Sequence, residues 1–135
     1  MLHHGEDAEL SEFLKAYDRC FLDKDLAGLR RFYPDDDREL IYLDNHEGND
    51  TWCVSDHLSL LKDFFEKGKA TESGAVEEIM MENVRYYKTE NAACICFLAR
   101  YRSFPDPAVR STMYLEKDRC EWKIKHVHCS FEPGK

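Results

Sequence analysis

The chain has 135 residues, of which 43% are hydrophobic and 34% charged, and 27 acidic side chains against 19 basic ones give a formal charge of −8. With 13% aromatic residues, this composition excludes a disordered chain and predicts one soluble globular domain over residues 1–135. An acidic protein repels phosphate backbones, so nucleic acid is not an expected partner.

The apolar segments are too short to cross a membrane. The longest uninterrupted one covers residues 92–99, whereas a spanning helix needs about 20 residues. The N-terminus is neither basic nor followed by an apolar stretch, so no secretory signal is expected. The sequence therefore predicts a cytoplasmic protein with no membrane partner.

Six cysteines are spread along the chain without a CxxC pair. In a cytoplasmic domain of this size we expect them to be reduced and mostly buried. Cys94 and Cys96 would share one face of a strand, but they do not complete a metal site. No metal and no cofactor is predicted.

The first half of the chain carries helical patterns. Apolar residues recur at three- and four-residue spacing over residues 7–21, which predicts an amphipathic helix. A second, short helix is expected over residues 25–33, where Pro34 ends it. A strand is predicted over residues 39–44, and a third helix begins at Ser55. Gly68 occupies the place of a left-handed C-terminal cap.

The second half is typical of β-strands. Strand-like segments cover residues 75–89, 92–104, 108–117 and 120–131, with short turn sequences between them. Consecutive hairpins predict an antiparallel sheet. The expected fold class is therefore α+β, with three N-terminal helices packed on a strongly curved, mainly antiparallel sheet.

The last predicted strand holds the most specific motif. Residues 120–130 read CEWKIKHVHCS. This string resembles the Trp-x-x-x-His-x-His-x-Ser ending of SnoaL-like domains and of the calcium/calmodulin-dependent kinase II association domain, to which residues 93–97 are also similar. From about Leu10 to Phe131 the chain resembles the nuclear transport factor 2-like superfamily. The resemblance implies a single SnoaL-like domain with a cystatin-like cone fold and a cavity between helices and sheet.

The association domains line their pocket with arginines from the last three strands. The matching positions here are Ala99, Met113 and Cys129, so the resemblance implies a less polar cavity. Such a cavity suits a small, mostly apolar ligand. The residues expected to contact this ligand are Tyr42, Trp52, Phe97, Ala99, Tyr101, Met113 and Cys129.

Small isomerases of the same superfamily use a tyrosine on the first helix and an aspartate at the end of the first strand. The matching residues are Tyr17 and Asp44. The resemblance implies that Asp44 carries a proton between carbons, that Tyr17 donates a hydrogen bond to the enolate oxygen and that His57 assists. The isomerases' second acidic residue has no counterpart near residues 111–113.

Each of these three residues also has a purely structural interpretation. Asp44 can open a solvated turn, Tyr17 can pack its ring in the core, and His57 can lie on the surface. A cofactor-independent isomerase or lyase is therefore the alternative to a ligand-binding protein without catalytic activity.

His126 and His128 lie two residues apart, so both side chains are predicted to share a face with Trp122 and Ile124. If Cys129 faces the cavity, the two histidines point away from it. A His-x-His pair can bind a metal, but neighbouring strands offer no suitable further ligand. We expect this face of the sheet to form a homodimer.

Overall fold

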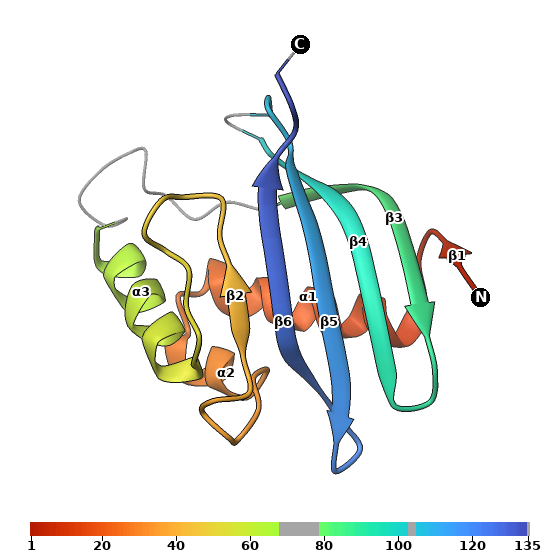
Figure 1. Ribbon diagram of the computed structural model, residues 1–135, viewed down its shortest axis with the longest axis horizontal. Helices are drawn as coiled ribbons and strands as arrows, with labels where there is room; N and C mark the ends of the chain where they lie inside the picture. The colour runs from red at the N-terminus through yellow and green to blue at the C-terminus, as the bar shows by residue number, and fades with distance from the viewer. Residues whose placement is uncertain (68–78, 103–104, 135) are drawn as a thin grey trace.

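Four long strands joined by hairpins make up most of a single six-stranded sheet (Figure 1). The computed structural model describes residues 1–67, 79–102 and 105–134. In chain order, its elements are β1 (His3–His4), α1 (Ala8–Leu22), α2 (Leu26–Arg30), β2 (Ile41–Leu43), α3 (Val54–Lys67), β3 (Ile79–Lys88), β4 (Ala92–Tyr101), β5 (Val109–Asp118) and β6 (Glu121–Phe131).

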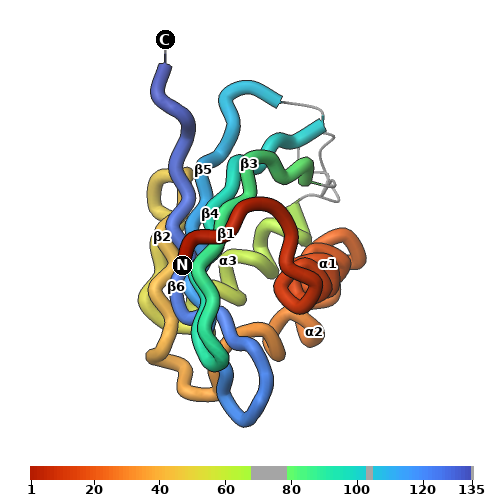
Figure 2. Tube along the Cα trace, turned by 90° about the vertical axis from the view of Figure 1, so that its right-hand side faces the viewer, coloured from red at the N-terminus to blue at the C-terminus, as the bar shows by residue number. Residues whose placement is uncertain are grey.

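The strands are ordered β1-β3-β4-β5-β6-β2, and the sheet is not closed into a barrel. Neighbouring strands are antiparallel except β2 and β6, which run parallel. Helix α1 runs across one face of the sheet, and Figure 2 shows α1 and α2 on the same side of it. The α+β class with a mainly antiparallel sheet is thus confirmed. No helix within the described residues is long and apolar enough to cross a membrane.

Some sequence predictions differ from the structure or fall outside it. The cap predicted at Gly68 lies outside the described residues, as do the first four residues of the strand predicted over 75–89 and the last two of the strand predicted over 92–104. Neither β1 nor the parallel pairing of β2 with β6 was predicted, because strands of two or three residues carry too little periodicity.

Aspartate caps begin the first two helices. The Asp7 carboxylate accepts a hydrogen bond from the Leu10 N–H at 3.1 Å, and Asp25 accepts one from the Gly28 N–H at 2.9 Å. At Gly28 a Cβ atom would collide with the Asp25 carboxylate and press on the sulfur of Cys20. Glycine at this position of α2 therefore leaves room for the Asp25 cap and for the close approach of Cys20 from α1.

Charged side chains fasten the start of α1 to the sheet. The Lys88 ammonium lies 3.0 Å from the Asp7 carboxylate. Glu9 accepts a hydrogen bond from the Trp122 indole N–H and pairs with the Lys117 ammonium at 3.1 Å. Because these partners come from β3, β5 and β6, they fix α1 across the face of the sheet that it covers.

A bulge in β6 changes which side chains face the helices. Tyr114 pairs with His126 and the next residue of β5 pairs with Ile124, so Lys125 has no partner in the ladder. As a result Trp122, Ile124 and Val127 all belong to the core. The prediction that His126 and His128 share a face with Trp122 and Ile124 is therefore wrong, because strict alternation does not continue through a bulge.

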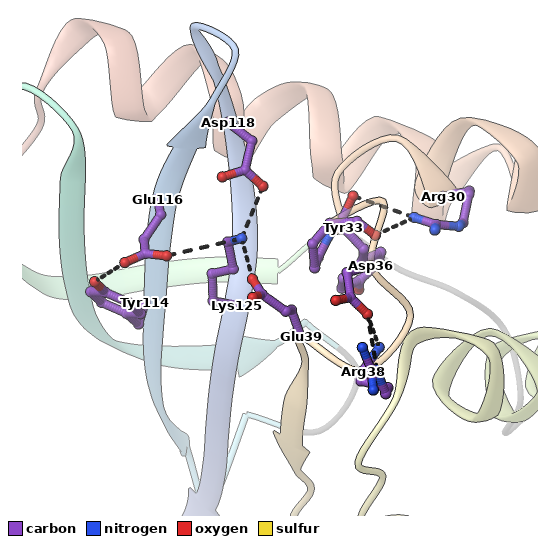
Figure 3. Close-up of polar contacts among 10 residues, drawn as sticks. Arg30, Tyr33, Asp36, Arg38, Glu39, Tyr114, Glu116, Asp118 and Lys125 are labelled. Carbon is purple, nitrogen blue, oxygen red and sulfur yellow. Dashed lines mark hydrogen bonds and ion pairs between the residues drawn. The ribbon is translucent and has the colours of Figure 1, made fainter.

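Lys125 is held in the bulge by three carboxylates, as Figure 3 shows. Its ammonium nitrogen lies 2.8 Å from Glu39, 2.9 Å from Asp118 and 3.9 Å from Glu116. The Tyr114 hydroxyl donates to Glu116 at 2.7 Å. Since Glu39 lies just before β2, this network joins the β5–β6 hairpin to the segment that leads into β2.

All six cysteines are free thiols. The prediction that most of them are buried is wrong, because Cys96 and Cys120 are exposed and the other four are only partly buried. The fully buried positions are instead occupied by aliphatic and aromatic side chains, among them Leu29, Tyr33, Leu40, Leu115 and Ile124.

Candidate functional site

A cavity of about 470 Å³ lies between α1 and the face of the sheet that α1 covers. Strands β3 to β6 supply one wall and α1 supplies the other, with further contributions from the β2 segment. Most of the lining surface is apolar. Its aliphatic and phenylalanine side chains are Leu10, Leu14, Phe21, Phe64, Ile79, Met81, Val84, Ile95, Phe97, Ala99, Val109, Met113 and Val127.

The structure brings most of the predicted site residues together around this cavity. Those that line it are Tyr17, Tyr42, Asp44, Phe97, Ala99, Tyr101, Met113 and Cys129. Trp52 does not line it, and 64% of this residue is exposed. His57 does not line the cavity either, but its ring stacks on Tyr42, which does. The ligand-contacting and catalytic roles of these residues stay predictions.

His57 is connected to the cavity through two tyrosine hydroxyls. The Tyr17 and Tyr33 hydroxyl oxygens are 2.6 Å apart, and the Tyr33 hydroxyl lies 2.9 Å from Nε2 of His57. The Tyr42 ring stacks on the imidazole with centroids 4.0 Å apart. His57 is only 3% exposed, so it is not the surface histidine that the structural interpretation allowed.

Tyr33 is the residue that the sequence analysis did not assign to the site. It is completely buried and provides the central hydroxyl of the chain from Tyr17 to His57. Its partners lie 16 and 24 residues away in the sequence, and no local pattern signals such a contact.

Burial keeps the aromatic polar groups uncharged. It lowers the pKa of His57 to about 4, and it raises the pKa of Tyr17, Tyr33 and Tyr42 above the ordinary value for a phenol. Near neutral pH the His57 imidazole and the hydroxyls of Tyr17 and Tyr33 therefore exchange hydrogen bonds as neutral groups, and the Tyr42 hydroxyl is neutral as well.

Asp44 combines a turn position with a place in the cavity lining. Its backbone N–H donates to the Asp50 carboxylate at 2.9 Å, and its own carboxylate accepts a hydrogen bond from the Asn49 side chain at 3.3 Å. Burial is the largest cause that raises the pKa of Tyr42 and of Cys129, and the charge of Asp44 is a smaller cause that raises both. The carboxylate therefore lies within electrostatic range of both side chains.

The sheet wall carries uncharged, weakly polar groups at three of the positions that the sequence analysis assigned to the cavity. Ala99, Met113 and Cys129 all line the cavity, and the Cys129 sulfur lies 3.3 Å from the Ser111 hydroxyl. Among the described lining residues the one cationic side chain is Lys15, which comes from α1. The strand wall is therefore unsuited to holding an anion.

His126 and His128 lie on the opposite side of the sheet from the cavity. Their neighbours on β6, Val127 and Cys129, line the cavity, and a ring nitrogen of His126 donates to the Ile41 carbonyl at 2.9 Å. Within the described part of the chain, no group of three or more histidine, cysteine, aspartate and glutamate side chains could hold a metal ion.

Known structures share this architecture, although no protein-family model and no curated protein matches the sequence. A nuclear transport factor 2-like protein of unknown function from Pseudomonas putida KT2440 aligns with a TM-score of 0.71 at 15% identity, over 91% of this chain and 84% of that one. A protein described as a calcium/calmodulin-dependent protein kinase II association domain from Xanthomonas campestris gives 0.71 at 14% identity, over 96% and 89%.

An uncharacterised protein with a cystatin-like fold from Caulobacter vibrioides is also similar, with a TM-score of 0.69 at 8% identity, over 92% of this chain and 87% of that one. At these identities the comparisons show the fold alone. The chain has the nuclear transport factor 2-like, cystatin-like fold, which confirms the resemblance seen in the sequence.

The buried His57 predicts a specific loss of stability in acid. As the pH falls below about 6.5, the unfolded chain binds a proton at His57 before the folded protein does, so stability decreases down to about pH 4. Between neutral pH and about pH 4.5, we expect the wild type to lose about 2–3 kcal/mol more free energy of unfolding than His57→Gln. Urea denaturation at both pH values measures the difference.

The control for this prediction is His4→Gln, which changes an exposed histidine of β1. It should retain the wild-type pH dependence. An equal acid-induced loss in wild type and His57→Gln would contradict a neutral, buried His57.

Proposed function

We propose that this protein binds a small, mostly apolar ligand in the cavity between α1 and the sheet. The observation that supports this proposal is the cavity itself, whose volume of about 470 Å³ lies within the range of small-molecule sites. Its apolar lining would exclude water from the body of the ligand, and burial of that body would supply most of the affinity.

The polar groups of the lining would orient the ligand. Four of these lining groups, Tyr17, Asp44, Tyr101 and Cys129, lie close enough to Tyr42 to raise its pKa. A few converging polar groups in an otherwise apolar cavity are typical of sites that select one orientation of a ligand.

The protein would also form a homodimer through the outer face, by which we mean the face of the sheet opposite the cavity, including His126 and His128. Three exposed apolar side chains lie on the outer face, because each is adjacent on its strand to a residue that lines the cavity. They are Ile41, Met80 and Tyr87, which are 43%, 43% and 54% exposed. A second copy of the chain would cover these apolar side chains.

Proton transfer is the second candidate function. The observation that favours it is that Tyr17 and Asp44 line the same cavity. In such a reaction a C–H bond next to a carbonyl breaks, the proton passes to the Asp44 carboxylate and the electron pair moves to the carbonyl oxygen, which Tyr17 would stabilise as an enolate.

Filling the cavity tests the binding function. Ala99 lines the cavity from β4, and Ala99→Phe would occupy the space of the ligand without opening a void. We expect this variant to bind 1-indanol at least tenfold more weakly than the wild type, by roughly 1.4 kcal/mol or more, in isothermal titration calorimetry. Ala92→Phe, on the same strand but outside the lining, is the control. Unchanged affinity in Ala99→Phe would refute binding in this cavity.

A charge on the outer face tests the homodimer. His128 is exposed, and His128→Glu would place an unpaired carboxylate in the contact between two copies. We expect light scattering to give a dimer for the wild type and a monomer for this variant. Ser59→Glu adds the same charge on an exposed position of α3 and should remain dimeric. A monomeric wild type at micromolar concentration would contradict the proposal.

Isotope exchange tests proton transfer without knowledge of the substrate. The second candidate predicts that the wild type accelerates deuterium uptake at the carbon next to the carbonyl of 1-indanone, on the order of a hundredfold, and that Asp44→Asn abolishes this acceleration. Proton NMR in D₂O follows the exchange. Asp63→Asn on α3 serves as the control, and exchange at the rate of buffer alone in the wild type would eliminate this function.

A further inference from the structure

The Tyr33 hydroxyl has one proton and two hydrogen-bond partners. It lies 2.6 Å from the Tyr17 hydroxyl and 2.9 Å from Nε2 of His57, and the tyrosine is completely buried. Because one proton serves one bond, Tyr33 donates to one partner and must accept from the other. The chain of hydroxyls therefore has a direction, and this direction determines which group Tyr17 presents to the cavity.

The relative strengths of the donors and acceptors set this direction. A neutral imidazole nitrogen is more basic than a phenol oxygen, and a phenol O–H is more acidic than an imidazole N–H. The stronger arrangement has Tyr33 donating to Nε2 of His57. Tyr33 must then accept the proton of Tyr17, so the hydrogen of Tyr17 points away from the cavity.

We propose that Tyr17 presents only an oxygen lone pair to the cavity, and that the site therefore selects apolar molecules carrying a hydroxyl group, alcohols or phenols, over the corresponding ketones and ethers. This inference rests on the proposed binding function and specifies the chemical class of its ligand. His57 acts here as a positioning residue, since it directs the hydroxyl chain without touching the ligand.

Asp44 strengthens the same selectivity. A carboxylate can only accept hydrogen bonds, and one of its oxygens already accepts from Asn49 at 3.3 Å. Tyr17 and Asp44 are thus two acceptors that the lining offers to the hydroxyl of a ligand. Groups that can donate also line the cavity, among them Tyr42, Asn45 and Ser111, so the selectivity belongs to the part of the cavity next to Tyr17 and Asp44. Lys15, the cation of the described lining, lies two residues from Tyr17 on α1 and so projects from the helix in a different direction.

A matched pair of probes tests the selectivity. 1-Indanol and 1-indanone share their apolar body, but only the alcohol has a hydroxyl donor. We expect the wild type to bind the alcohol at least about fivefold more tightly in isothermal titration calorimetry. Tyr33→Phe removes the hydroxyl that accepts the Tyr17 proton. The Tyr17 O–H is then free to turn towards the cavity, so the preference for the alcohol should disappear or reverse towards the ketone.

Tyr87→Phe, which removes an exposed hydroxyl from the outer face, should keep the wild-type preference. Equal affinity for both probes, or a preference of the wild type for the ketone, would overturn the inference and leave the proposed binding function intact. Failure of the wild type to bind either probe would count against the binding function itself, and with it against the selectivity.

Nitrogen NMR of the imidazole tests the direction of the chain without any ligand and without a variant. We expect the ¹⁵N signal of Nε2 in His57 to have the chemical shift of an unprotonated, hydrogen-bond-accepting nitrogen near neutral pH, with the proton on Nδ1. A proton on Nε2 would overturn the inference, because Tyr33 would then donate to Tyr17.

Discussion

Lys125 occupies the bulge in β6, and the side-chain alternation of the strand changes phase there. With Ile124 in the core, unbroken alternation would turn His128 towards the helices and Val127 and Cys129 away from them. The bulge reverses this, so that Val127 and Cys129 line the cavity. The carboxylates around Lys125 keep its charge on the outer side of the sheet. The set of side chains that line the cavity therefore depends on one residue that has no partner in the strand ladder.

The hydroxyl chain imposes a second constraint, because its members come from three separate segments. Tyr17 belongs to α1, Tyr33 follows α2, and His57 belongs to α3. Buried polar groups are costly without partners, so the hydrogen bonds are complete only when all three segments are in place. The same contacts that position the helices thus determine the chemistry that one wall of the cavity presents.

Local sequence patterns predicted the sheet, and most of the predicted site residues line the cavity, whereas contacts between distant residues could not be predicted. The hairpin pattern indicated an antiparallel sheet, and Ala99, Met113 and Cys129 were assigned to the cavity from the resemblance. The bulge at Lys125 depends on carboxylates from another segment, and the partners of Tyr33 lie far away in sequence. Neither contact leaves a periodic signal.

The shared fold does not decide between functions, because unrelated activities occur on one scaffold. Two details of the cavity separate this chain from the activities that the resemblance implies. Ala99, Met113 and Cys129 place uncharged side chains on the strand wall, so these positions hold no charge for an anion. Stabilising an enolate requires a proton from Tyr17, but a chain directed towards His57 uses that proton internally. A mostly apolar cavity with hydrogen-bond acceptors at Tyr17 and Asp44 remains, and this arrangement favours binding of an alcohol over proton transfer from a carbonyl compound.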